Sequence, residues 1–169
     1  LGASYEFQSL GLTPYATVTY LDRQYTDMKF LKKRLSPSRT EKYTTSNTGT
    51  PPWSGRLGIK FDRDFDRSVI FHSNVYLEWA SLAKETVYDT SALLPNSSGN
   101  PATYEYGFVT NKMPGWATLN VDLGLEYGEE HKWTVALSLR NIFDRQYTRA
   151  TNVIEEPGFH AVLGVGFEF

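Results

Sequence analysis

The residues best suited to chemistry in this sequence are its histidines, because imidazole serves as a general base or a metal ligand near neutral pH. His72, His131 and His160 lie far apart, without the HxxxH or similar spacing that brings two ligands to one metal ion. The chain has no cysteine, which excludes disulfides, redox pairs and thiolate metal sites. We therefore expect no cofactor and no metal, and His160 is the one histidine to test as a haem or metal contact.

A basic segment is the first candidate for ligand binding, and it contains Lys29, Lys32, Lys33, Arg34, Arg39 and Lys42. Clustered cations raise the local potential and concentrate anions. The segment could therefore bind an anionic ligand or the phosphates of lipopolysaccharide, although a solvated loop is the preferred interpretation. The net charge of the whole chain is -2, which gives nucleic-acid binding no electrostatic support.

Two further segments offer ligand contacts. An aromatic one suits a planar aromatic ligand, with packing between loops as the alternative; it contains Tyr88, Tyr104, Tyr106, Phe108 and Trp116. Arg149 could bond a ligand carboxylate, or could pair with Glu155 or Glu156. The candidate ligand-binding residues are thus Lys32, Lys33, Arg34, Arg39, Tyr88, Tyr104, Tyr106 and Arg149.

The elements that must position these residues show the two-residue period of β-strands. In the clearest one, Phe159–Phe169, apolar side chains occupy every second position up to the terminal Phe169. No segment has a sustained helical period, so we predict an all-β fold. The predicted strands are seven: Ala3–Gln8, Tyr15–Tyr20, Arg56–Asp62, Val69–Trp79, Ala117–Tyr127, Trp133–Arg140 and Phe159–Phe169.

The connections between these strands alternate in length, as in bacterial outer-membrane barrels, where the short turns are periplasmic. The short ones are Ser9–Thr13, Asp62–Arg67 and Gly128–Lys132, and the long ones are Tyr25–Pro52, Ser81–Pro114 and Asp144–Pro157. An eleven-residue strand tilted by about 45° covers about 25 Å, the height of a lipid-facing band. We therefore predict a transmembrane antiparallel β-barrel.

Aromatic and charged residues fit the same barrel. Aromatic residues lie at the strand ends, as in the girdles of such barrels: Tyr127, Trp133 and Phe169 on the short-turn side, and Trp53, Trp79 and Phe159 on the other. The other face of the strands is charged, as expected for an inner wall, and carries Arg56, Lys60, His72, Glu78, Asp122, Glu126, Arg140, His160 and Glu168. An odd number of strands would leave open edges, so we expect further strands before this segment.

Three motifs carry a family resemblance. The stretch Asn141–Tyr147 (N-I-F-D-R-Q-Y), the pair Pro157-Gly158 and the terminal Phe169 resemble the end of the barrel in TonB-dependent outer-membrane receptors. Pro114–Leu123 resembles the strand that precedes them, whereas Phe159 departs from the arginine usual in the family. The residue types in these motifs suggest structural roles. Asn141 and Asp144 can form hydrogen bonds with nearby backbone, and Gly158 permits a bend.

The resemblance implies that residues 1–169 are the C-terminal portion of a receptor barrel, the last seven of 22 strands, without the plug and the N-terminal strands. It implies a non-enzymatic receptor in a Gram-negative outer membrane that imports a scarce nutrient, such as a ferric siderophore, with energy from the TonB complex acting on the plug. Haem or cobalamin would be alternative ligands, and a passive porin or an outer-membrane enzyme alternative classes. The barrel-assembly machinery, reading Phe169, and outer-membrane lipid with lipopolysaccharide would be further partners.

Overall fold

The computed structural model describes residues 1–32, 39–66, 68–94, 105–129, 132–149 and 155–169. These residues form eleven β-strands and no helix. No helix among them is therefore long and apolar enough to cross a membrane. The strands belong to two compact units, one made of Leu1–Tyr20, Trp53–Ser81 and Gly115–Phe169, the other of Leu21–Pro52 and Leu82–Pro114.

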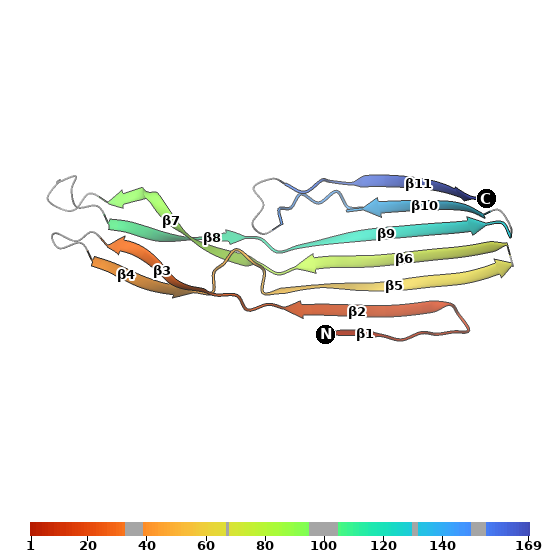
Figure 1. Cartoon of the computed structure of the whole chain (residues 1–169), viewed down its shortest axis with the longest axis horizontal. Helices are drawn as coiled ribbons and strands as arrows, with labels where there is room; N and C mark the ends of the chain where they lie inside the picture. Colours follow the sequence, from red (N-terminus) through yellow and green to blue (C-terminus); the bar gives the residue numbers. More distant parts are fainter. Residues whose placement is uncertain (33–38, 67, 95–104, 130–131, 150–154) are drawn as a thin grey trace. The chain divides into compact units, whose positions relative to one another are not determined.

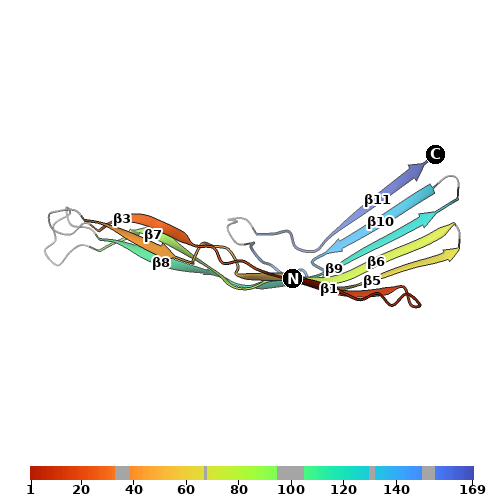
Figure 2. The same ribbon diagram turned by 60° about the horizontal axis from the view of Figure 1, so that its bottom comes forward.

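The first unit is an antiparallel sheet of seven strands in the order β1-β2-β5-β6-β9-β10-β11. Each strand pairs with the next one that belongs to this sheet, and Figures 1 and 2 show the strands side by side in one layer. The sheet confirms seven antiparallel strands. The first is shorter than predicted, since only Gly2–Ser4 of the region around Ala3–Gln8 is a strand, and the second begins earlier than predicted, at Leu12. Their bounds are β1 Gly2–Ser4, β2 Leu12–Tyr20, β5 Trp53–Asp66, β6 Val69–Ala80, β9 Trp116–Tyr127, β10 Lys132–Arg140 and β11 His160–Glu168.

One short turn is shorter than the sequence indicated. Residues Asp62–Asp66, predicted as part of a turn, continue β5, and the pairing with β6 reaches Asp66 opposite Val69 with one irregularity after Asp64. The charged residues of this stretch gave no apolar alternation, so the sequence pattern did not predict a strand here. Backbone hydrogen bonds to β6 form without such a pattern.

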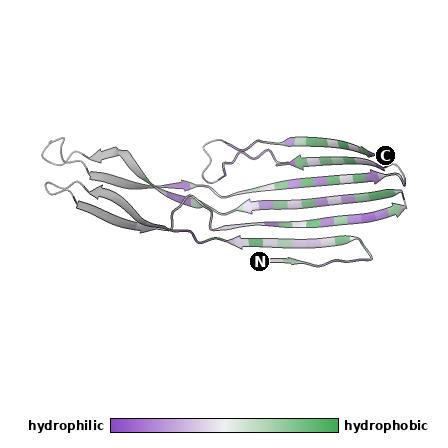
Figure 3. Ribbon diagram, in the orientation of Figure 1, coloured by the Kyte–Doolittle hydropathy of each residue, from purple (hydrophilic) through white to green (hydrophobic). Residues whose placement is uncertain are grey.

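The sheet has two chemically different faces. Cross-strand partners point to the same face and neighbours along a strand to opposite faces, so each register row lies on one face. The row through Ile59, Val75, Val121 and Leu139 is apolar, whereas the next one, through Lys60, Asn74, Asp122 and Ser138, is polar. Figure 3 shows the result as alternating hydrophobic and hydrophilic bands along the strands. We call these the apolar face and the polar face.

The second unit corrects the prediction of two long loops. Its four strands are β3 Tyr25–Lys32, β4 Arg39–Thr45, β7 Ala83–Leu94 and β8 Glu105–Met113, in the order β4-β3-β8-β7. They lie within Tyr25–Pro52 and Ser81–Pro114, which were predicted to be loops without strands. The two hairpins pair with each other through Lys32 and Glu105. Backbone pairing holds strands that lack a regular alternation of apolar and polar residues, which explains why the sequence pattern missed them.

A threonine-rich cluster ties one end of the second unit together. Residues after β4 reach the far strand of the sheet, where Thr48 bridges Glu85 and the Thr86 amide donates to the Asn47 carbonyl at 2.9 Å. The Asn47 side-chain amide also donates to the Thr86 hydroxyl at 3.2 Å. Thr48 and Thr86 are buried, so these polar groups satisfy each other away from water.

Candidate functional site

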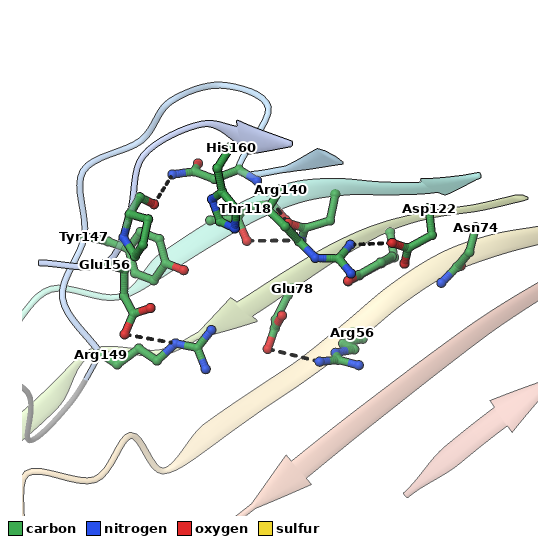
Figure 4. Close-up of a pocket in the computed structure, with 14 residues that line it drawn as sticks. Arg56, Asn74, Glu78, Thr118, Asp122, Arg140, Tyr147, Arg149, Glu156 and His160 are labelled. Carbon is green, nitrogen blue, oxygen red and sulfur yellow. Dashed lines mark hydrogen bonds and ion pairs between the residues drawn. The ribbon is translucent and has the colours of Figure 1, made fainter. Parts of the chain in front are cut away.

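The polar face of the seven-stranded sheet contains a cavity of about 530 Å³. Its walls come from β5, β6, β9, β10, the start of β11 and the segment between the last two strands (Figure 4). The lining residues are almost all polar or charged: Arg56, Asn74, Tyr76, Glu78, Thr118, Asn120, Asp122, Arg140, Asn141, Tyr147, Arg149, Glu156, Pro157 and His160. A cavity of this size accommodates a small ligand, and its polar lining favours a polar one.

Tyr76 lies in the floor of this cavity. Its side chain is buried, and the guanidinium carbons of Arg56 and Arg140 lie 5.4 and 5.6 Å from its ring centre. Both are within the range of an attractive cation–π contact. Two arginines from different strands are therefore held over one aromatic ring.

Each of these arginines also has a carboxylate partner. Arg140 Nη1 lies 2.7 Å from Asp122 Oδ1, which also accepts a hydrogen bond from the Ser138 hydroxyl at 2.7 Å. Arg56 Nη2 lies 3.5 Å from Glu78 Oε1. These pairs join neighbouring strands and cancel the charges of the cavity floor locally.

A third pair stands at the opposite wall, in the segment between β10 and β11. Arg149 Nε lies 3.4 Å from Glu156 Oε1, and the Arg149 guanidinium lies 5.6 Å from the Trp116 ring centre. Trp116 in turn packs on Tyr147, with ring centres 4.5 Å apart. Burial lowers the pKa of Arg149, but the Tyr147 hydroxyl and Glu156 outweigh it, so the pKa lies above the usual value and the cation persists.

Asn141 fixes the start of this segment. Its backbone has a positive φ of 50°, which asparagine tolerates better than most residues. The Asn141 side chain accepts a hydrogen bond from the Arg145 amide at 3.0 Å and donates one to the Arg145 carbonyl at 2.8 Å. The Asn141 amide itself donates to Asn120 Oδ1 at 3.1 Å. The structural role predicted for Asn141 is thus confirmed.

Asp144 and Gly158 bring the segment back to the sheet. Asp144 also has a positive φ, 51°, and its Oδ1 accepts a hydrogen bond from the Phe159 amide at 2.8 Å. A Cβ added to Gly158 would overlap that same oxygen. Glycine is therefore required by close approach, which refines the predicted role of a bend. Together these contacts place Tyr147, Arg149 and Glu156 at the cavity.

His160 lines the cavity with a defined ring orientation. Its Nδ1 lies 3.0 Å from the Gly158 carbonyl oxygen, an acceptor, so Nδ1 carries the proton. In the neutral ring Nε2 then bears the lone pair. Among the described residues, no group of three or more His, Asp or Glu side chains is placed to hold a metal ion. His160 can thus contribute one polar contact to a ligand.

The structure places the predicted ligand residues unequally. Arg149 is at the cavity, and its pairing with Glu156 agrees with one of the two interpretations left open for it. For Lys32, Arg39, Tyr88 and Tyr106 the structure describes only backbone, on β3, β4, β7 and β8 of the second unit. Lys33, Arg34 and Tyr104 lie outside the described residues. Ligand binding by these seven residues stays a prediction.

Most residues of the cavity were not among the predicted ligand contacts. Arg56, Glu78, Asp122 and Arg140 were recognised only as inner-wall charges, and Tyr76, Thr118 and Asn120 were not singled out. All of them lie at the polar positions of the alternating pattern in the sequence. Strand register, which sequence alone did not provide, would have shown that they meet.

Comparisons with protein-family models, with curated proteins and with solved structures give no match to this chain.

Proposed function

We propose that the seven-stranded sheet is part of the wall of a transmembrane β-barrel in a Gram-negative outer membrane. The supporting observation is the exposure of the apolar face. On the inner strands β5 and β6, Leu57, Ile59 and Val75 are 59, 51 and 43% exposed, whereas Asn120 and Thr118 on the polar face are 3 and 4% exposed. This is the reverse of a water-soluble sheet, which buries its apolar face, and it suits lipid outside and polar contacts inside.

The separation between aromatic residues at the two ends of the strands agrees with the height expected for such a wall. Tyr127, Trp133 and Phe167 form one register row near the short-turn ends of the strands. Trp79 pairs with Ala117 near the other end, ten residues along β9 from Tyr127. Ten residues span about 33 Å, and a tilt of about 45° reduces this to about 23 Å of height. That agrees with the apolar band of outer-membrane barrels.

The edges of the sheet support a larger barrel. Strands alternate in direction across seven positions, so β1 and β11 run the same way. β1 and β11 therefore cannot pair with each other in antiparallel fashion to close a barrel. The same holds for β11 of one copy and β1 of the next in a ring of identical copies around a common axis. Closure needs an odd number of further strands, and open edges are not tolerated in lipid. A barrel of 22 strands, as in the TonB-dependent receptors that the motifs resemble, would meet this condition.

We infer that this barrel is a receptor of that kind and imports a nutrient with TonB-derived energy transmitted through a plug. Support comes from Asn141, Asp144 and Gly158, whose motif builds a folded segment that lines a ligand-sized cavity. A ferric siderophore remains the first ligand class to test, with haem and cobalamin as alternatives. A passive porin would use the same wall without the energy supply.

Uptake by intact cells tests this function. A strain that lacks the full-length protein should lose uptake of labelled ligand, tested with iron chelates, haem and cobalamin, and an uncoupler should stop uptake in the parent strain. The protein should fractionate with the outer membrane. Uptake that continues after the proton gradient collapses would indicate a porin and contradict the proposal.

A further inference from the structure

The cavity on the polar face combines strong hydrogen-bonding capacity with charge balance. Three guanidinium groups and three carboxylates line it, from Arg56, Arg140, Arg149, Glu78, Asp122 and Glu156. The ion pairs match each arginine with one of these acids, at 2.7 to 3.5 Å. With histidine counted as neutral, as in the formal charge of the whole chain, the lining has no net formal charge.

We propose that this cavity binds a ligand group that carries no net charge and is rich in hydrogen-bonding oxygens. The inference rests on the proposed receptor function and specifies its substrate class. It differs from the expectation drawn from the basic segment, which favoured an anion.

An anionic ligand would gain little in this cavity. A multiply charged anion that approaches Arg140 or Arg56 also approaches Asp122 or Glu78, because the partner oxygens are 2.7 and 3.5 Å away. Attraction and repulsion then nearly cancel at the distance of a ligand. Displacing a carboxylate would strand a charge beside the largely buried Tyr76, which is unfavourable.

An uncharged, oxygen-rich ligand would gain more. A guanidinium has five N–H donors and a carboxylate about four acceptor positions, so one ion pair leaves donors and acceptors for a ligand. The side-chain amide of Asn74 on β6 and the imidazole of His160 at the start of β11 add neutral partners. Both the hydrogen-bond donors and the acceptors of such a ligand therefore find fixed partners, in a lining that has no net formal charge.

Two classes of compound carry this chemistry. In a ferric tris-hydroxamate, three singly charged groups neutralise the iron, whereas a ferric tris-catecholate keeps three negative charges. The two are matched chelates that differ in charge. Neutral oligosaccharides are the second uncharged source, and their carboxylated counterparts are the matched anions.

The experiment is a titration of the purified full-length protein with each chelate, and with a panel of neutral trisaccharides and their carboxylated analogues. We expect at least about tenfold tighter binding of one uncharged class than of its anionic match. This affinity should change little between about 0.05 and about 0.5 M salt. Whether the hydroxamate or a saccharide binds identifies the source.

Charge variants connect the preference to the cavity. Glu78→Gln leaves Arg56 unbalanced, so binding of the anionic member should improve by about three- to tenfold relative to the uncharged one. Arg56→Gln combined with Glu78→Gln restores balance and should restore the original preference. Glu126→Gln makes the same charge change on the polar face outside the cavity, beside Lys132, and should leave the preference unchanged.

The results that would overturn this inference differ from those that would overturn the proposed receptor function. Equal or tighter binding of the anionic chelate or sugar overturns the inference, as does failure of every uncharged probe to bind while energy-dependent uptake persists. The variant His160→Cys carries a thiol at an exposed position of the lining, and this thiol must react with a water-soluble maleimide in cells and be protected by the bound probe. If it is shielded without ligand, another part of the protein fills the cavity and the inference is wrong. Loss of energy dependence would instead remove the receptor function itself.

Discussion

Replacing Asn141 with alanine should loosen the segment that closes the cavity. The variant loses two hydrogen bonds with Arg145, at 2.8 and 3.0 Å, each contributing about 0.5–1.5 kcal/mol. It also places an alanine at φ 50°, which costs about 1 kcal/mol. The sum is about 2–4 kcal/mol of local stability, or about 30- to 1000-fold in the opening equilibrium.

Hydrogen exchange of the full-length protein measures this opening. The Phe159 amide is the reporter, because its acceptor, Asp144 Oδ1, is not altered by the change. Its exchange should accelerate by the factor given above. Asn141→Gly loses the same hydrogen bonds but tolerates the positive φ, so it should exchange about fivefold more slowly than Asn141→Ala.

A matched control is Gln146→Ala, at an exposed position of the same segment, which should leave the Phe159 amide unchanged. Exchange in Asn141→Ala equal to that of the unmodified protein would refute the capping role of this side chain. Faster exchange in the glycine variant than in the alanine variant would refute the contribution of the positive φ.

Two further substitutions test other parts of the account. Gly158→Ala should force Asp144 Oδ1 away from the Phe159 amide and cost about 1–3 kcal/mol, measured by the same exchange experiment; unchanged protection there would show that the overlap is relieved without loss. Leu163→Arg, on the apolar face, should lower the free energy of unfolding in bilayers by about 2–4 kcal/mol, whereas the neighbouring Val162→Arg, on the polar face, should cost about 1 kcal/mol or less. Equal costs at the two positions would contradict the assignment of the faces.

The seven strands of the first unit were predictable because their side chains alternate in chemistry. Leu119, Val121, Leu123 and Leu125 alternate with polar residues or glycine along β9, and this pattern needs no knowledge of neighbouring strands. The structural roles of Asn141 and Asp144 were predictable for a similar reason, since their side chains bond to nearby backbone.

The four strands of the second unit were not predictable from the same pattern. In β4, the sequence Arg39–Thr45 contains a single apolar residue, Tyr43, and its cations, Arg39 and Lys42, do not follow a two-residue period. It pairs through its backbone with β3, which places Lys29 opposite Lys42 and Lys32 opposite Arg39. Like charges in register oppose such pairing, so side-chain preference gave no indication of it.

The cavity was not predictable because it depends on register. Arg56 and Glu78 are 22 residues apart in the sequence, yet they are partners across β5 and β6. A shift by one residue would exchange the two faces of a strand and remove the cavity. The sequence identifies the charged residues of the polar face but not which of them meet.

The central claim is that the apolar face contacts lipid and the polar face does not. Spin labels placed one at a time from Leu119 to Leu125 on β9 of the full-length protein in bilayers test it directly. Labels at Leu119, Val121, Leu123 and Leu125 should collide with oxygen dissolved in the lipid, and those at Asn120, Asp122 and Gly124 should not, giving a period of two. Equal oxygen access at all seven positions, or the opposite phase, would contradict the account.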